Sequence, residues 1–192
     1  MAIICKSGAE LDKMYQAGQV VWEVLNGLRQ MVQPGVSTLD LEKFAERRTA
    51  EAGARAAFKG YRGYPCVLCT SLNDEIVHGI PSASRQLREG DILSLDYGVE
   101  LDGFFGDAAV TVPVGKVAPA VQKLLEVTRE ALDRAIAQAR VGNRLSDISH
   151  AVQSWVEANG FSVVREYTGH GVGRELHETP PTVLHHGQRG KG

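Results

Sequence analysis

The sequence predicts an α+β protein made of two similar halves, in which helices cover one side of an antiparallel sheet. Two observations predict this fold class. A pair of helical patterns with a glycine-containing break occurs twice along the chain, and the two copies are 107 residues apart. Between the copies, alternating apolar and polar residues flank Asp102-Gly103, which is the pattern of a β-hairpin with a two-residue turn.

The first helix pair is expected in the first quarter of the chain. Apolar side chains recur with helical period over residues 8–33, and Pro34-Gly35 ends the pattern. Ser37 can cap a second helix, which ends before Gly53, a residue type suited to the position after a helix C-terminus. A glycine- and tyrosine-rich loop, GYRGYP, follows this helix.

Strands are expected next, because short runs of alternating residues lie between turn signals. The predicted strands are CVLCTSLN, DILSLDYG and FFGDAAVTV, and a short returning segment, EIVHGIP, follows the first of them. Residues 118–140 and 145–159 then predict two more helices. The last predicted strand, FSVVREY, leads into the glycine-rich GHGVGR.

The two helix pairs match at several boundaries. At the 107-residue offset Gly35 falls on Gly142, Asp40 on Asp147 and Gly53 on Gly160. Agreement at one offset over two helices and their ends favours duplication. We therefore expect one domain over 1–192, with a first half of about 1–115 and a partial second half of about 116–192. A copy of the hairpin would begin at about residue 198, so the second half is expected to be C-terminally incomplete.

Composition indicates an ordinary soluble globular protein, with 43% hydrophobic and 23% charged residues. A net charge of −2 gives no sign of a nucleic-acid or anionic-membrane partner. No apolar run reaches the ~20 residues of a membrane span, and the apolar run before Cys5 is too short for a secretory signal, so we expect a cytoplasmic protein. Three cysteines argue against a disulfide framework, and Cys66 and Cys69 fit apolar strand positions.

The hairpin carries two aspartates, Asp96 and Asp107. With the turn at Asp102-Gly103, residue 107 lies opposite residue 98 and on the same face as residue 96, within roughly 5–8 Å. Two such carboxylates raise each other's pKa unless a cation lies between them. The pattern allows a solvated polar face, or a divalent-metal site in which one carboxylate bridges two ions.

Three histidines lie beside glycine or proline or near the predicted strand ends. They are His78 in VHGIP, His170 in GHGVGR and His177 shortly after it. GHGVGR lacks the third glycine of a dinucleotide fingerprint, and His177-Glu178 does not continue as a zincin motif. Together with the aspartate pair, these histidines favour a metal-dependent or catalytic site.

Four motifs in order give the chain a family resemblance. GYRGYP, SLNDEIVHGIP, DYGVELDGFFGD and FSVVREYTGHGVGRELHETP resemble the type I methionine aminopeptidases over essentially the whole chain. The resemblance implies the duplicated pita-bread (creatinase/aminopeptidase-like) fold. It also implies a hydrolase that removes the initiator methionine from nascent chains, acting on N-terminal Met peptides close to the ribosome.

The resemblance assigns roles to individual residues. Asp96 and Asp107 are implied to bind two divalent ions, and His170 to bind one of them. The resemblance implies that His78 contacts the substrate and helps proton transfer, and that His177 hydrogen-bonds the scissile carbonyl or the intermediate. The implied pocket for the methionine side chain includes Tyr61, Tyr64 and Cys69.

The chain also departs from the family pattern. Arg62, Leu176 and Phe58 stand where histidine, phenylalanine and cysteine are common, which leaves the shape of the pocket open. The family completes its metal site with two glutamates, which are expected beyond Gly192, and one of them would be the general base. Whether the chain up to Gly192 binds metal or is active is left open, as is the choice among Co, Mn, Fe and Zn.

Three alternatives remain. An X-Pro aminopeptidase or prolidase shares the fold but usually has an additional N-terminal domain, whereas helices here begin by residue 8. A type II methionine aminopeptidase would carry a helical insert in its second half. A catalytically inactive pita-bread binding module would keep the fold and lose the metal ligands. The chain retains all three of the ligand positions that it spans, which argues against this alternative.

Overall fold

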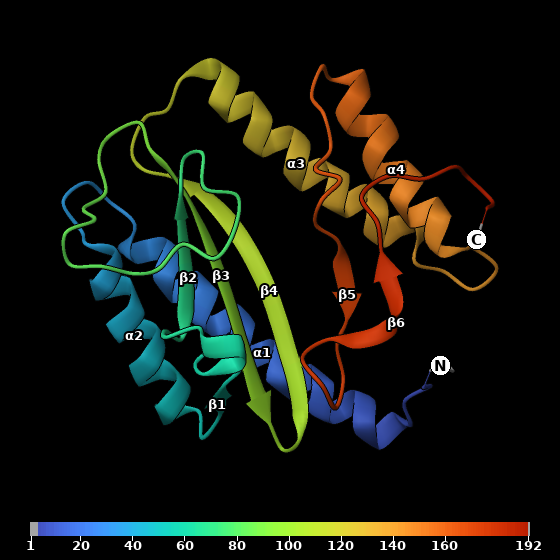
Figure 1. The fold of residues 1–192 in the computed structure, drawn as a ribbon, viewed down its shortest axis with the longest axis horizontal. Coiled ribbons are helices and arrows are strands. Elements are labelled where there is room, and N and C mark those ends of the chain that lie inside the picture. The colour runs from blue at the N-terminus through green and yellow to red at the C-terminus, as the bar shows by residue number, and fades with distance from the viewer. Residues whose placement is uncertain (1–3, 192) are drawn as a thin grey trace. The chain divides into compact units, whose positions relative to one another are not determined.

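The computed structural model describes residues 4–191 and divides them into two compact units (Figure 1). The larger unit contains Ile4–Ala118 and a short later segment, Val172–His177. The other unit contains Pro119–Gly171 and the residues from Glu178 onward. The short segment therefore returns to the larger unit after the chain has built most of the second one.

The larger unit is an antiparallel sheet with two helices on it. Strand β3 (Ile92–Leu101) pairs with all the other strands of this sheet. The helices α1 (Gly8–Met31) and α2 (Thr38–Glu51) pack on it, α1 along β3 and β4 and α2 along β1 and β2. The other strands are β1 (Arg55–Ala56), β2 (Leu68–Leu72) and β4 (Phe104–Pro113), and Tyr61–Gly63 forms the 3-10 turn η1.

Both helices begin at a serine whose side chain satisfies the first turn. Ser37 Oγ accepts from the Asp40 backbone N–H, and the Asp40 carboxylate accepts from the Ser37 N–H at 3.2 Å, which makes a capping box. Ser7 and Glu10 form the same arrangement at α1. The predicted cap at Ser37 is thus confirmed, and Glu10 fixes where the first helix starts.

The hairpin of β3 and β4 has the predicted turn. Asp102 and Gly103 have φ values of 51° and 80°, and Leu101 pairs directly with Phe104 across them. Left-handed backbone at both central residues is what a two-residue hairpin turn of matching twist requires, and Asp-Gly supplies it at low cost. The turn therefore fixes the register of every pair above it.

The core lies between the sheet and the helices. The apolar side of β3 is fully buried at Leu93, Leu95, Tyr97 and Val99, as the alternation predicts. Helix residues such as Leu28 and Leu41 meet them in one hydrophobic cluster. Because this face is filled, the side chains of the intervening positions must point to the other side of the sheet.

One buried hydroxyl pair crosses this core. Thr49 Oγ1 donates to the Ala45 carbonyl at 2.7 Å, so its proton is used and the Tyr97 hydroxyl donates to it at 2.6 Å. Burial raises the pKa of Tyr97, so the phenol stays protonated. The bond joins α2 to the central strand inside the core.

We expect Tyr97→Phe to lower the free energy of unfolding by about 1 kcal/mol, because a buried hydrogen bond is lost while Thr49 keeps its bond to Ala45. Urea unfolding measures the change. Tyr15→Phe is the matched control, since Tyr15 is 67% exposed on α1. Equal stabilities of the Tyr97 variant and the wild type would show that this hydroxyl pair contributes nothing.

The second unit repeats the helix pair. Helix α4 (Leu145–Ala158) has the bounds of α2 shifted by 107 residues, and α3 (Pro119–Gln138) ends where the shifted α1 ends. Gly142 and Gly160 have φ values of 94° and 85°, like their counterparts Gly35 and Gly53 at 91° and 65°. The predicted duplication of the helix pair is confirmed in backbone conformation as well as in sequence.

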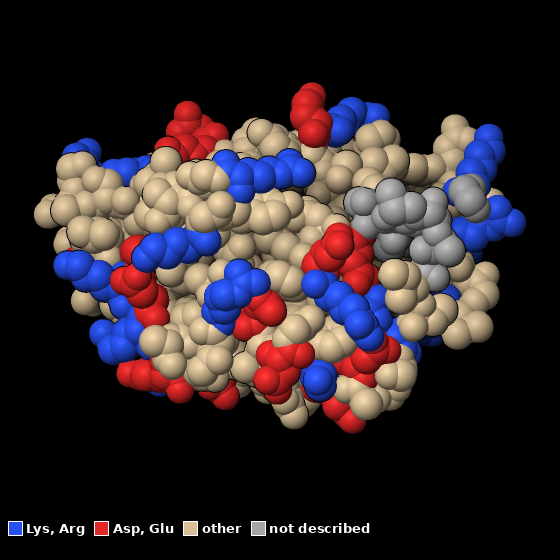
Figure 2. Space-filling model, turned by 60° about the horizontal axis from the view of Figure 1, so that its bottom comes forward, with Lys and Arg blue, Asp and Glu red and all other residues tan. Residues whose placement is uncertain are grey.

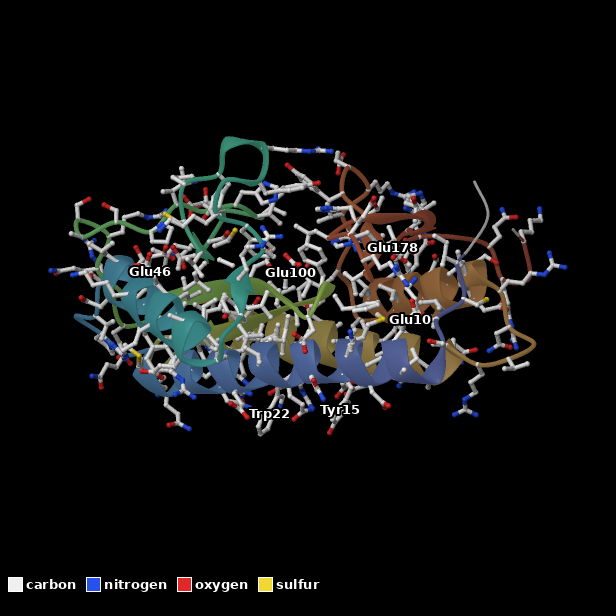
Figure 3. All side chains as sticks on the ribbon, turned by 90° about the horizontal axis from the view of Figure 1, so that it is seen from below. Glu10, Tyr15, Trp22, Glu46, Glu100 and Glu178 are labelled. Carbon is white, nitrogen blue, oxygen red and sulfur yellow. The ribbon has the colours of Figure 1, made fainter. Side chains whose placement is uncertain are left out.

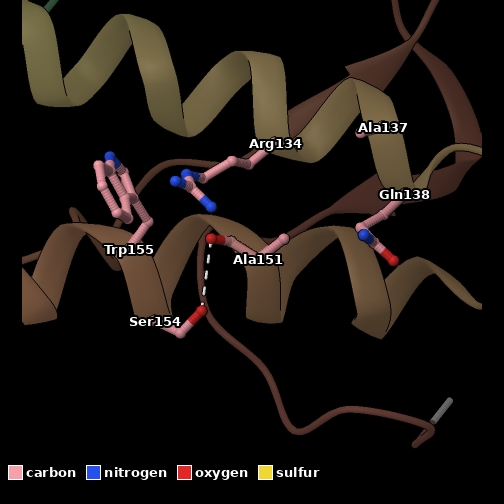
Figure 4. Close-up of a pocket in the computed structure, with 6 residues that line it drawn as sticks. All are labelled: Arg134, Ala137, Gln138, Ala151, Ser154 and Trp155. Atoms are coloured by element: carbon pink, nitrogen blue, oxygen red, sulfur yellow. Dashed lines mark hydrogen bonds between the residues drawn. The ribbon is translucent and has the colours of Figure 1, made fainter.

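Between α3 and α4 lies a shallow pocket of about 340 Å³ (Figure 4). The guanidinium of Arg134 lies 3.6 Å from the ring centre of Trp155, which faces it from α4. A cation on an aromatic face is a stabilising contact. It links the two helices beside their small apolar cluster of Val127, Ala131 and Val156.

The predicted strand FSVVREY is wrong. Residues 161–167 form no strand, and the ladder begins two residues later, where β5 (Gly169–Gly171) pairs antiparallel with β6 (Glu178–Val183). An alternating pattern indicates that successive side chains could point to opposite faces of a strand. It does not indicate that a neighbouring strand is present to pair with it. Without one, the backbone groups cannot form a ladder.

The surface carries both signs of charge. Figure 2 shows lysine and arginine interspersed with aspartate and glutamate over the face in view, in keeping with the net charge of −2. None of the helices in the described part of the chain combines the length and the apolar composition needed to cross a bilayer.

Candidate active site

The two aspartates lie on one face of the hairpin. Gly98 pairs with Asp107 and Asp96 pairs with Ala109, so the two side chains are diagonal neighbours on the face opposite Tyr97. Diagonal positions bring Cβ atoms within roughly 7–8 Å, a distance that long or bridging ligands can span. The predicted juxtaposition is confirmed, and both residues are partly buried.

The face around the aspartates is built from small residues. Ser94 and Thr111 bond to each other at 2.8 Å, and Gly98 carries no side chain opposite Asp107. A Cβ at Gly98 would come within 2.9 Å of the Phe58 ring, so that ring occupies the space beside Asp107. The aspartates thus have small neighbours on their own face and an apolar wall at one side.

Cys69 lies next to this pair. It is directly opposite Asp96 on the neighbouring strand β2, and it is 3% exposed. Burial, with a smaller contribution from the charges of Asp96 and Asp107, raises the pKa of the Cys69 thiol to about 12, although a hydrogen bond from Tyr64 works in the opposite direction. The thiol is therefore neutral and acts as an apolar part of the floor, and all three cysteines are free.

Tyr64 connects the floor to the loop that carries His78. Its hydroxyl lies 3.0 Å from the Leu68 carbonyl and 3.1 Å from the Gly79 carbonyl, and both carbonyls share its single proton as acceptors. Burial raises the pKa of Tyr64, so the phenol remains a donor. The hydroxyl is therefore occupied by the backbone carbonyls and by the neighbouring Cys69 thiol, and the ring is the part of Tyr64 that could line a substrate pocket.

His78 sits at the tip of this loop in an unusual conformation. Its φ is 61°, which is uncommon for a residue other than glycine. The following residue, Gly79, is locked to β2, because its carbonyl accepts from Thr70 N at 2.8 Å and its N–H donates to Ser71 Oγ at 3.1 Å. These bonds fix the backbone next to His78, whose imidazole is exposed.

His177 and Tyr61 meet although they are 116 residues apart. Their rings stack with centroids 5.3 Å apart and an angle of 17°, and the Tyr61 hydroxyl lies 3.0 Å from His177 Nδ1. Both residues are exposed. The family resemblance implies a substrate-binding role for both residues, and the structure brings their side chains together.

His170 belongs to the other unit, in β5. Its Nδ1 lies 3.0 Å from the Gly171 carbonyl, which can only accept, so Nδ1 carries the proton. A backbone bond at one ring nitrogen is how metal-binding histidines are commonly oriented for ligation through the other. Its role as a metal ligand remains a prediction.

The donor set suits a hard divalent ion but is not a complete shell. Two carboxylates on one face are the oxygen ligands that such ions accept. Among residues 4–191, no group of three or more histidine, cysteine, aspartate or glutamate side chains could hold an ion by itself. The aspartate pair therefore fits a metal centre that needs further ligands.

Glu42 is a structural residue of the site that the sequence analysis did not identify. It is 7% exposed on α2, and its two carboxylate oxygens accept from the N–H groups of Val67 at 2.7 Å and Leu68 at 2.9 Å. Burial raises the pKa of Glu42 against these bonds. A glutamate beside Leu41 and Ala45 on the apolar helix face was the available signal.

Glu10 and Arg174 form an ion pair on the larger unit, with Nη2 and Oε1 2.5 Å apart. The Ser7 backbone N–H, together with Arg174, lowers the pKa of Glu10 to about 2 from its usual 4.5. A lowered pKa means that ionised Glu10 stabilises the fold above pH 4.5, and that this contribution is lost as the pH falls towards 2.

We therefore expect Glu10→Gln to flatten the acid side of the stability profile. The melting temperature of the wild type should fall more steeply than that of the variant between pH 4.5 and about 2. Glu126→Gln, on the surface of α3, should leave the slope unchanged. Parallel profiles for Glu10→Gln and wild type would contradict the assigned pKa direction.

Helices on one face of an antiparallel sheet, with paired aspartates on the other, place the chain in the class of metal-dependent peptidases with the pita-bread fold. The model of one family, described as Metallopeptidase family M24, matches residues 12–191. The chain belongs to this family.

Similar curated proteins carry the name methionine aminopeptidase. "Methionine aminopeptidase 1" of Bacillus subtilis is 49% identical and "Methionine aminopeptidase" of Clostridium acetobutylicum is 47% identical, each over 99% of this chain and 76% of its own length. A crystal structure of methionine aminopeptidase from Thermotoga maritima superposes with a TM-score of 0.97 at 42% identity, covering 100% of this chain and 76% of that one.

Proposed function

We propose that the chain is a methionyl aminopeptidase, a metal-dependent hydrolase that removes the N-terminal methionine from proteins. The observation that carries the proposal is the aspartate pair on the hairpin face, in a chain 44–49% identical to several methionine aminopeptidases over nearly its whole length. The finer proposal is that two divalent ions are held by Asp96, Asp107 and His170. The substrates would be nascent chains near the ribosome in the cytoplasm.

Each group has a chemical task in this reaction. Bound divalent ions supply Lewis acidity, which polarises the scissile carbonyl and lowers the pKa of water. Asp96 and Asp107 provide the negative oxygens that hold them. The Tyr61 hydroxyl lies within hydrogen-bond distance of His177 Nδ1. In the tautomer that would serve this reaction, the hydroxyl donates to Nδ1 and the ring proton is on Nε2, where it can stabilise negative charge on the carbonyl oxygen. His78 would contact the substrate and help proton transfer.

The methionine side chain needs an apolar slot beside the aspartates. Cys69, the ring of Tyr64 and the ring of Phe58 provide apolar surface around that face. An unbranched thioether fits such surface without leaving a buried polar group unpaired. Phe58 narrows the space beside Asp107, which favours a slim side chain.

The test is hydrolysis of Met-Ala-Ser by the complete protein, including any residues that follow Gly192, with Co²⁺ or Mn²⁺ present. Release of free methionine, its loss with a chelator, and no release from N-acetyl-Met-Ala-Ser are the expected results. Faster cleavage of an Ala-Pro peptide than of Met-Ala-Ser would instead indicate an X-Pro peptidase. Failure to cleave either peptide at any metal concentration would support the binding module.

His170→Ala should raise the metal concentration needed for half-maximal rate by about 10-fold or more, because a nitrogen ligand is lost. A metal titration of the initial rate measures the shift. His150→Ala on α4 is the control and should leave the requirement unchanged. An unaltered requirement in the His170 variant would remove that residue from the metal site.

A further inference from the structure

The segment Val172–His177 is attached to the larger unit at several points. Phe105 N–H donates to the Gly173 carbonyl at 2.8 Å, and Leu176 is only 4% exposed. His177, at its end, stacks on Tyr61. The position of this imidazole therefore depends on how the preceding five residues are held.

Arg174 is the charged anchor of this segment. Its Nη2 and Nε lie 2.5 Å and 3.2 Å from the same oxygen of Glu10, Oε1. Its guanidinium also lies 5.6 Å from the ring centre of Phe104, at the start of β4. Lys13 approaches the same ring at 5.9 Å, so two cations share one aromatic side chain that is 6% exposed.

Glu10 is itself held rigidly. Its other oxygen, Oε2, accepts from the Ser7 N–H at 2.7 Å and from the Ser7 hydroxyl at 2.8 Å, as part of the capping box of α1. Oε2 thus fixes the Glu10 carboxylate at the start of α1, and Oε1 accepts hydrogen bonds from the Arg174 guanidinium. Figure 3 shows Glu10 near the N-terminal end of α1.

We propose that the contact between Arg174 and Glu10 positions His177 against Tyr61, which makes Arg174 a positioning residue for the reaction. The Arg174 side chain is 67% exposed, and an ion pair with an exposed partner contributes little to global stability. Its effect on geometry is larger, because only two residues separate Arg174 from His177 and a displacement of about 1 Å at a reacting group can cost up to 100-fold in rate. The kinetic part of this inference rests on the proposed function.

Arg174→Met tests the idea, because methionine keeps an apolar chain over Phe104 while removing the guanidinium. We expect kcat on Met-Ala-Ser to fall about 10-fold with KM changed less than about 2-fold. Arg174→Lys, which keeps the positive charge, should recover most of the rate. Arg129→Met is the control, since its exposed pairing with Asp133 on α3 lies outside this segment.

A second readout needs no activity. In the ¹⁵N-labelled protein, the Nδ1 signal of His177 should shift in Arg174→Met and return towards the wild-type position in Arg174→Lys. Unchanged His177 signals in Arg174→Met, or a kcat equal to that of the wild type, would overturn the positioning role. If the wild type does not cleave Met-Ala-Ser, the proposed function fails, while the His177 signal still decides whether Arg174 orients the ring.

Discussion

Replacing Asp107 with asparagine is expected to abolish metal-dependent cleavage of Met-Ala-Ser, with a loss of at least about 100-fold. An amide cannot supply the negative charge that a hard divalent ion requires, and even residues that only support metal ligands cost 10–100-fold when removed. The fold should survive, because Asp107 faces away from the core formed by Tyr97 and its neighbours. Steady-state assays across metal concentrations, together with circular dichroism, measure both effects.

Asp102→Asn in the same hairpin is the matched control. Asp102 has φ 51° in the turn, a conformation that asparagine also adopts readily, so the hairpin and its activity should persist. Both variants remove one carboxylate from one ribbon, and only the position differs. Wild-type activity in Asp107→Asn would remove this residue from the metal centre.

Gly79→Ala is expected to impair both stability and activity. A Cβ at this position would lie 2.2 Å from the Thr70 carbonyl oxygen and 2.8 Å from the Ser71 Cα, which are backbone atoms that cannot rotate away. The loop would have to leave β2, breaking the bond from Thr70 N and displacing His78. We expect a loss of about 1–3 kcal/mol in the free energy of unfolding, with a rate reduced about 10-fold or more.

Gly18→Ala separates this clash from a general effect of adding a methyl group. Gly18 lies within α1, and a Cβ there would meet nothing within 4 Å. Alanine is the better helix former, so this variant should gain up to about 1 kcal/mol. Denaturant unfolding and initial rates of both variants make the comparison. If Gly79→Ala were as stable and active as Gly18→Ala, the close approach of the loop to β2 would not matter.

The parts of the fold that local sequence determines were predictable. The Asp102-Gly103 turn fixes the hairpin register, so the diagonal placement of Asp96 and Asp107 follows from counting residues away from it. The duplicated helix pair was visible because an aspartate in the first turn of the second helix and the flanking glycines recur at one offset. Helix α4 accordingly has the bounds of α2 moved by 107 residues.

Contacts between distant segments had no local signal. Nothing in the sequence near Tyr61 or Glu10 indicates that His177 and Arg174 will meet them, because loop closure over more than 100 residues is settled by the whole fold. The strand prediction for residues 161–167 was wrong for a related reason, since a strand also depends on a contact with another segment. Apolar and polar residues do alternate in this segment. A β-strand also needs a neighbouring strand to hydrogen-bond with, and the alternation does not indicate whether such a strand is present.

The most direct test is anomalous diffraction from crystals of the complete protein grown with Mn²⁺ or Co²⁺. The predicted result is a peak at roughly 2.0–2.2 Å from carboxylate oxygens of both Asp96 and Asp107. A metal peak that contacts neither aspartate, in crystals of protein that cleaves Met-Ala-Ser, would contradict the view that the hairpin carboxylates are the foundation of the site.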